Sequence, residues 1–162
     1  SAASDVYKRQ GLGIALALKM DHSPAKVYVM LGDGELEEGV VWEAIMTAPA
    51  LGADNLIAIL DCNRIQKMDF VEKTIGNPRW AEKWASFGWE VLETDGHDME
   101  AFKNAILQKT EEKKPRVIIA NTVKGKGVSV MENNPNWHFK LPGRKDLKVF
   151  KAELGISDSE LE

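Results

Sequence analysis

The sequence has little of several features that define whole classes of protein. It contains a single cysteine, Cys62, which excludes an internal disulfide and is typical of a reducing compartment. No apolar run approaches the roughly 20 residues that a membrane-spanning helix needs. The first ten residues, SAASDVYKRQ, lack the apolar segment of a signal peptide. We therefore expect a cytoplasmic protein that does not enter a membrane.

An excess of charge of one sign is also missing. The chain has 25 acidic and 21 basic residues, which are interspersed, and its formal net charge is -4 at pH 7. A dedicated nucleic-acid surface normally shows a basic stripe, so we expect no nucleic-acid partner. Any phosphate-bearing ligand must be held by a local site. The length of 162 residues suits one α/β domain with a buried core.

Four short runs rich in Val, Ile and Leu predict β-strands. The runs are mostly continuous rather than alternating, as expected of strands that are covered on both faces. Helical patterns lie between them, and this alternation predicts a doubly wound, mainly parallel sheet with helices on both faces. The expected strands are 26–31, 55–61, 89–94 and 116–121, and the expected helices are 11–20, 37–51, 78–87 and 98–110.

The stretch GDGELEEG (32–39) stands where the first expected strand gives way to a helix. The two glycines that flank Asp33 allow the backbone to pass close to a bulky anion, but the Asp33 carboxylate would repel a bare phosphate. A divalent cation between carboxylate and phosphate removes this conflict. Mg²⁺ prefers oxygen ligands, and the next expected strand is followed by Asn63 and the backbone carbonyl of Ile65. The alternative is that Asp33 and Asn63 are ordinary turn residues.

A GDG motif followed about thirty residues later by an asparagine after an apolar strand is the thiamine diphosphate motif. The segment 32–66, with TDGHD (94–98) and TVKGKG (122–127) in register, resembles transketolase, and more closely the amino-terminal subunit of transketolases split into two polypeptides. The resemblance implies a thiamine diphosphate-binding fold that is truncated at its amino terminus. We expect an unmatched amino-terminal tail, the thiamine diphosphate-binding domain and a peripheral carboxy-terminal tail at 1–10, 11–142 and 143–162.

The resemblance implies roles for the residues that match the family's motif. The metal ligands are expected to be the side chains of Asp33 and Asn63 and the carbonyl of Ile65, with Mg²⁺ or Ca²⁺ as the ion. Gly34 is expected to lie against the diphosphate of the cofactor, which Asn63 also helps to bind.

Further roles are implied outside this motif. Lys124 resembles the family lysine that reaches the cofactor from a closing loop. His138 resembles the histidine near the diphosphate and the substrate oxygens, and it is the expected catalytic residue. Glu38 and Glu43 match carboxylates near the subunit interface. Lys124 as a solvated loop lysine and His138 as a structural histidine remain the alternatives, and a turn or helix-start role is favoured for His97.

The implied activity is transfer of a two-carbon ketol unit between sugar phosphates, with the reaction chemistry supplied by thiamine diphosphate. The family's pyrimidine-binding domain and the histidines that precede the matched region have no counterpart among these residues. We therefore expect a homodimer, a partner chain that carries the pyrimidine-binding domain, or both. Arg64, Phe70 and Phe139 stand where the family usually has glycine. The alternatives are an enzyme similar to deoxyxylulose-phosphate synthase, and a non-catalytic module that binds Mg²⁺ or diphosphate or serves in assembly.

Two further features have structural interpretations. Trp80, Trp84 and Phe87 recur at helical spacing, which is typical of a core or an interface. Cys62 is expected to be a packed small residue, because no histidine is placed beside it in sequence to activate a thiolate.

Overall fold

The protein folds around a parallel β-sheet. The computed structural model describes residues 2–67, 69–109 and 113–157, and side chains from residue 9 onward. The sheet has four strands in the order β1-β2-β4-β3, and each neighbouring pair is parallel. The strands are β1 (Val27–Gly32), β2 (Leu56–Cys62), β3 (Glu90–Asp95) and β4 (Arg116–Asn121).

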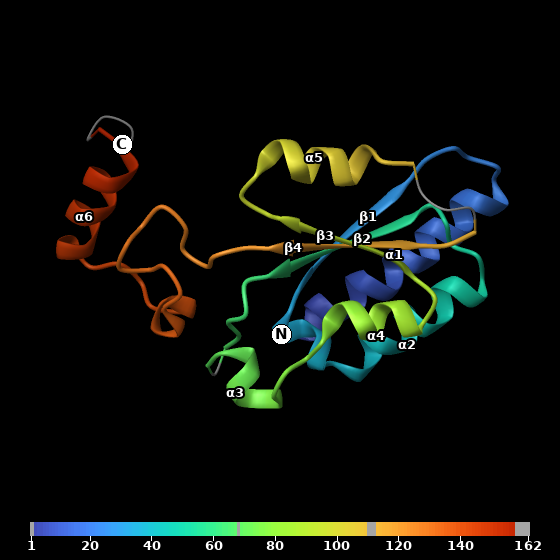
Figure 1. Cartoon of the computed structure of the whole chain (residues 1–162), viewed down its shortest axis with the longest axis horizontal. Helices are drawn as coiled ribbons and strands as arrows, with labels where there is room; N and C mark the ends of the chain where they lie inside the picture. The colour runs from blue at the N-terminus through green and yellow to red at the C-terminus, as the bar shows by residue number, and fades with distance from the viewer. Residues whose placement is uncertain (1, 68, 110–112, 158–162) are drawn as a thin grey trace.

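Helices lie on both faces of this sheet. Figure 1 shows α1, α2 and α4 on one face, α5 on the other, and α6 apart from both. In the described part of the chain, no helix is long and apolar enough to cross a bilayer. The helices are α1 (Ala2–Met20), α2 (Gly39–Ala50), α3 (Val71–Ile75), α4 (Trp80–Ser86), α5 (Met99–Leu107) and α6 (Arg144–Leu154), with short 3₁₀ helices η1 (Gly34–Glu37) and η2 (Pro135–His138).

The larger core lies between the sheet and the layer formed by α1, α2 and α4. Alternate strand residues such as Leu60 and Val117 point into this layer and are fully buried. Trp84 of α4 packs edge-on against Trp89, with 4.6 Å between ring centroids. The indole N–H of Trp89 donates to the carbonyl of Ile45 at 2.8 Å, which ties α2 to the start of β3. The aromatic stripe predicted at Trp80, Trp84 and Phe87 therefore belongs to the core.

Among the described residues, α5 covers only part of the opposite face of the sheet. Phe102 and Ile106 of α5 pack against a small cluster that contains Ile118 of β4. On β1, Tyr28 and Met30 point to the same face and are 48% and 67% exposed. The predicted doubly wound parallel sheet is confirmed, but its helices cover the two faces unequally.

The predicted strands agree with the observed ones to within about one residue, and β4 spans 116–121 as expected. Three helices differ from the expectation. Helix α1 begins at Ala2 instead of residue 11, and the sequence pattern predicts neither α3 nor α6. In α3 only Val71 is buried, so there is no periodic apolar face to detect. The predicted region boundaries at residues 10 and 142 stay predictions.

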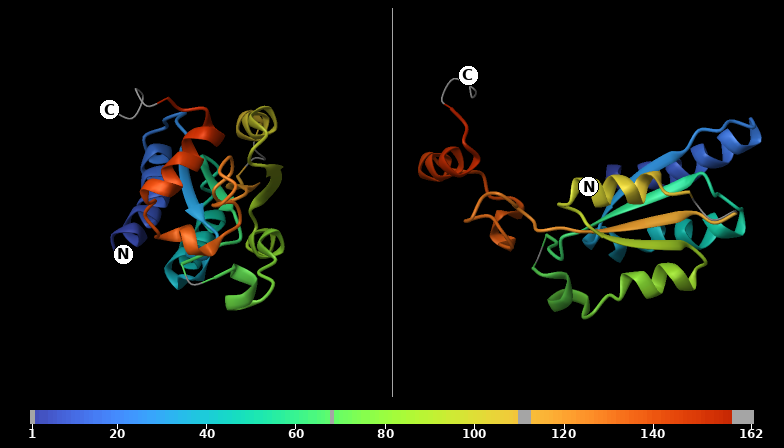
Figure 2. Two further views of the ribbon diagram at one scale, coloured as in Figure 1. Left: turned by 90° about the vertical axis from the view of Figure 1, so that its left-hand side faces the viewer. Right: turned by 45° about the horizontal axis from the view of Figure 1, so that its top comes forward.

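The chain after β4 forms an arm, residues 123–157, that stands clear of the sheet and its helices (Figures 1 and 2). The arm has packing of its own. The ring of Trp137, which is largely buried, lies 5.6 Å from that of Phe150 on α6. The backbone N–H of Ser129 donates to the Glu153 carboxylate at 2.7 Å. These contacts join the loop after β4 and α6 into one unit.

A buried arginine ties three elements together at the amino-terminal end of the sheet. Arg116 of β4 is fully buried and makes two N–H···O bonds of 2.9 Å to the carboxylate of Glu90 on β3. Its other N–H groups donate to the carbonyls of Ala105, Gln108 and Lys109 at 3.2, 2.6 and 2.8 Å. The guanidinium thus satisfies acceptors that the end of α5 leaves open, and it places positive charge at the negative end of the helix dipole.

We predict that Arg116→Ala lowers the free energy of unfolding by about 3–5 kcal/mol, because it deprives the largely buried Glu90 carboxylate of its guanidinium partner. Arg79→Ala is the control and should lose less than about 1 kcal/mol, since the ion pair of Arg79 with Glu82 is exposed. Denaturant titrations followed by tryptophan fluorescence measure both values. Equal losses in the two variants would contradict the structural role of Arg116.

Candidate functional site

The site lies at the carboxyl ends of β1 and β2, which are neighbours in the sheet. Their register pairs Gly32 with Asp61, so the two chains leave the sheet side by side. The backbone N–H of Asp33 donates to the carbonyl of Asp61 at 3.3 Å and extends the pairing one residue beyond β1. Open α/β sheets bind their ligands outside this edge. The two motifs that the sequence predicts to share an ion are therefore adjacent.

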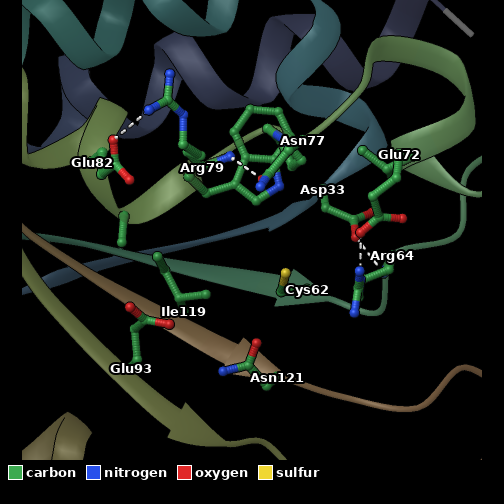
Figure 3. A pocket seen from close by; sticks show the side chains of 14 residues that line it. Asp33, Cys62, Arg64, Glu72, Asn77, Arg79, Glu82, Glu93, Ile119 and Asn121 are labelled. Atoms are coloured by element: carbon green, nitrogen blue, oxygen red, sulfur yellow. Dashed lines mark hydrogen bonds and ion pairs between the residues drawn. The ribbon is translucent and has the colours of Figure 1, made fainter.

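Asp33 lies at the centre of this junction and is only 2% exposed. One carboxylate oxygen accepts a hydrogen bond from the N–H of Gly34 at 2.7 Å. The other accepts from the N–H of Arg64, which follows β2, and Figure 3 shows the two residues side by side near Glu72. The Asp33 side chain thus links the loop after β1 to the loop after β2.

Burial makes the charge of Asp33 unfavourable. Removal from water raises the pKa of the carboxyl from 3.8 to about 6, although the N–H groups of Arg64 and Gly34 oppose the increase. The negative charges of Asp61 and Glu72 raise the pKa further. A cation next to the carboxylate would favour the ionised form. Asp33 therefore has the electrostatics expected of a metal ligand, because a bound cation would stabilise its ionised carboxylate.

Asn63 and Ile65 form a tight turn immediately after β2. The side-chain oxygen of Asn63 accepts from the N–H of Ile65 at 3.0 Å, and its amide nitrogen donates to Asp61 at 3.1 Å. Ile65 is buried and forms an isolated β-bridge with Phe70. The turn is thus held on both sides, so that the oxygens predicted to bind the ion have defined positions.

A single cleft of about 370 Å³ brings together every residue that the sequence predicts for the site. These residues are Asp33, Gly34, Asn63 and Ile65 at the ends of β1 and β2, and Lys124 and His138 on the arm. Segments more than 50 residues apart in sequence therefore meet at one place. The structure gives their positions, and their roles in binding and catalysis stay predictions.

Two glycines of the motifs have steric reasons to be glycine. A Cβ atom on Gly34 would lie 2.6 Å from the Cβ of Gln66, so the two loops can approach only because Gly34 has no side chain. Gly125 has a φ of 78°, and a Cβ there would lie 2.7 Å from the backbone of Met131. This turn folds the TVKGKG segment back on the arm, with Lys124 lining the cleft.

The cleft also contains three basic side chains, Lys67, Lys124 and His138. Partial burial, together with the positive charges of Lys124 and Lys67, lowers the pKa of His138 below its ordinary 6.5. The lowered pKa favours the neutral ring, which can donate one hydrogen bond and accept another. Sequence reasoning misses Lys67, because one lysine in a polar loop carries no signal beyond its place two residues after Ile65.

The donor set fits a hard divalent cation that is shared with a phosphate. In the described ranges there is no group of three or more His, Cys, Asp or Glu side chains that could hold a metal ion. Asp33 offers a carboxylate, whereas Asn63 and Ile65 offer neutral oxygens, which is about half of the octahedral set that Mg²⁺ takes. Water and phosphate oxygens suit the remaining positions. The residues present thus fit a metal diphosphate better than a metal alone.

Two of the neighbouring clefts lie on opposite faces of the sheet at the same strand ends. One, of about 390 Å³ on the α5 face, contains Asp61 and His97, whose Nε2 accepts from the N–H of Val123 at 2.7 Å. His97 thus holds the start of the arm. The other, of about 310 Å³ on the opposite face, is shown in Figure 3 and contains Asp33 and Cys62. Burial, then the charge of Asp33, raises the pKa of the Cys62 thiol to about 11, which disfavours a nucleophilic thiolate.

The carboxylates after the GDG motif have different surroundings. Glu35 accepts a hydrogen bond from the N–H of Gly32 at 3.1 Å and so closes the turn after β1. Glu38 lines the cleft, whereas Glu43 is exposed on α2. The expected place of Glu38 and Glu43 near a subunit interface stays a prediction.

Known proteins are similar to this chain in sequence. A family model described as transketolase, thiamine diphosphate binding domain, matches residues 13–161. A subunit of apulose-4-phosphate transketolase from Actinobacillus succinogenes is 40% identical over 143 residues, which are 88% of this chain and 52% of that protein. The 6-deoxy-6-sulfo-D-fructose transketolase subunit SqwG from Clostridium sp. is 41% identical over 144 residues, with coverage of 88% and 52%. The chain thus spans about half the length of these relatives.

Solved structures share the fold. Transketolase from Campylobacter jejuni has a TM-score of 0.83 and 30% sequence identity, and the match covers 91% of this chain and 24% of that one. The transketolase complex with sedoheptulose-7-phosphate from Pichia stipitis has a TM-score of 0.81 at 30% identity, with coverage of 91% and 23%. From the extent of the family match and the shared fold, we conclude that this chain belongs to the transketolase family, whose thiamine diphosphate binding domain it carries.

Proposed function

We propose that this chain is the thiamine diphosphate-binding part of a transketolase whose active site is completed by a partner polypeptide. One observation carries the proposal: the ends of β1 and β2 and the arm line a single cleft with both oxygen donors and basic groups. Such a cleft suits a cation and a diphosphate together. The relatives that are named as transketolase subunits support both the reaction and the need for a partner.

In this proposal each group of the cleft has a separate task. Asp33, Asn63 and the Ile65 carbonyl would hold Mg²⁺. Lys124 would add positive charge beside the diphosphate, and His138 would offer an N–H to the diphosphate or to a substrate oxygen. When bound, thiamine diphosphate supplies the carbon nucleophile that carries the two-carbon ketol unit. The chain's own contribution is to bind and orient the cofactor, and to exclude water with the arm.

The names of the relatives suggest the class of substrate. Apulose-4-phosphate and 6-deoxy-6-sulfo-D-fructose are both sugars with an anionic substituent. We infer that the substrates of this enzyme are likewise a ketose and an aldose that carry a phosphate or a sulfonate.

Calorimetry with thiamine diphosphate tests the metal bridge. We expect binding of thiamine diphosphate to require Mg²⁺. In Asp33→Ala the affinity should fall at least about 100-fold, because losing a metal ligand should cost more than the roughly 10–100-fold lost with a residue that only hydrogen-bonds such a ligand. Asp54→Ala is the matched control. It removes an aspartate that precedes β2 at the opposite end of the sheet, where it pairs with Lys19. Metal-independent binding, or equal affinity of the Asp33 variant, would contradict the proposal.

The raised pKa of Asp33 predicts a pH dependence with a definite sign. In the metal-free chain, one carboxyl carbon should titrate with a midpoint of about 6 in ¹³C NMR spectra, and Asp33→Asn should remove that resonance. Adding Mg²⁺ with inorganic pyrophosphate should lower the midpoint, because the cation stabilises the ionised carboxylate. A midpoint near 4 without metal, or one that metal and pyrophosphate leave unchanged, would count against this description of the site.

The need for a partner predicts the behaviour of the chain in an activity assay. With thiamine diphosphate, Mg²⁺, a ketose phosphate and an aldose phosphate, the chain alone should show no turnover. Addition of a polypeptide that carries a transketolase pyrimidine-binding domain should restore it. Pyruvate with glyceraldehyde phosphate serves as the control pair for deoxyxylulose-phosphate synthesis. Turnover by the chain alone would exclude the requirement for a partner.

A further inference from the structure

Asp61 contacts the predicted metal ligand Asn63, and Thr122 contacts Asp61. Asp61 is near the end of β2, and Thr122 immediately follows β4. The hydroxyl of Thr122 donates to Oδ1 of Asp61, and the backbone N–H of Thr122 donates to the carbonyl of Cys62 at 3.3 Å. A third strand end is therefore tied to the loop that carries Asn63.

An asparagine that binds a cation must present its oxygen, because its NH₂ group repels positive charge. The two ends of the amide are nearly the same size, so shape alone does not select the orientation. At Asn63 the neighbours select it. Oδ2 of Asp61 lies 3.1 Å from the amide nitrogen, and the N–H of Ile65 donates to the amide oxygen at 3.0 Å. The reversed amide would place oxygen against carboxylate and N–H against N–H.

Asp61 can fix this orientation only if its own carboxylate is fixed. With Oδ1 engaged by the hydroxyl of Thr122, Oδ2 remains turned toward Asn63. All three residues are partly buried, so water competes less effectively for these hydrogen bonds. A continuous series of bonds therefore runs from Thr122 through Asp61 to Asn63.

We propose that Asp61 is a positioning residue which, held by Thr122, keeps the amide oxygen of Asn63 turned toward the metal. This inference rests on the proposed function, because it concerns the same ion. It extends the metal site to the end of β4. Asp61 also contributes negative charge near the ion. Substitutions at Thr122 change the orientation of the Asp61 carboxylate but leave this charge in place, so the two effects can be measured separately.

Three variants of the full chain make this separation. Asp61→Asn removes the charge and the selective acceptor, Thr122→Val removes only the hydroxyl, and Thr122→Ser keeps it. Calorimetry should show Mg²⁺-dependent thiamine diphosphate binding about 10–100-fold weaker in Asp61→Asn, as for other outer-shell partners of metal ligands. We expect a loss of about 3–10-fold in Thr122→Val, toward the lower end of that range, and less than about twofold in Thr122→Ser.

NMR spectra of the metal-free chain add a readout that does not depend on the cofactor. The side-chain NH₂ resonances of Asn63 should report its bond to the Asp61 carboxylate and should change in Thr122→Val but not in Thr122→Ser. Urea titrations of each variant verify that it is folded. Unchanged binding in Asp61→Asn would overturn the inference, as would normal binding in Thr122→Val. Absence of Mg²⁺-dependent binding in the unaltered chain would overturn the proposed function with it.

Discussion

The site depends on the junction between the ends of β1 and β2. Asp33 continues the backbone pairing beyond β1, and its carboxylate accepts hydrogen bonds from backbone N–H groups in the loops after both strands. The register behind this junction is set by the buried face of the sheet, where Leu31 and Leu60 are paired and packed in the main core. A slip of one residue would turn that face outward and separate Asp33 from Asn63. The apolar core thus fixes the geometry of a polar site.

The two parts of the cleft have complementary electrostatic requirements. The body of the domain contributes Asp33. The hydrogen bonds to its buried carboxylate do not fully offset the cost of burying the negative charge, so a neighbouring cation would stabilise the ionised form. The arm contributes Lys124 and His138, and the pKa of His138 is lowered by partial burial and then by the positive charges of Lys124 and Lys67, beside which an anion would be stabilised. A metal diphosphate would place a cation beside Asp33 and an anion beside the basic groups. A bare metal would leave the basic groups unpaired, and a bare phosphate would meet the Asp33 charge.

The sequence predicts the architecture and part of the site, for identifiable reasons. Continuous apolar strands and helical periodicity indicate the doubly wound sheet, and the spacing of Asp33 and Asn63 after successive strands places them at one edge. Lys124 and His138 come only from the family resemblance, because no periodic pattern predicts where the arm turns. Asp61 is missed because the positioning role proposed for it depends on the hydroxyl of Thr122, which follows β4 and is 61 residues away in sequence. The run KVYVML predicts burial on both faces, whereas Met30 is 67% exposed, since a residue pattern does not show which neighbours lie over it.

Strand β4 carries Arg116 at its first residue and is followed directly by Thr122. Six residues of extended chain separate the two by about 20 Å, at roughly 3.3 Å per residue, which is beyond the range at which substitutions normally couple. Changes around the ligand and changes in the scaffold are thus expected to combine additively. Substitutions around the cleft can therefore accumulate without lowering the stability that Arg116 gives to the far end of the sheet.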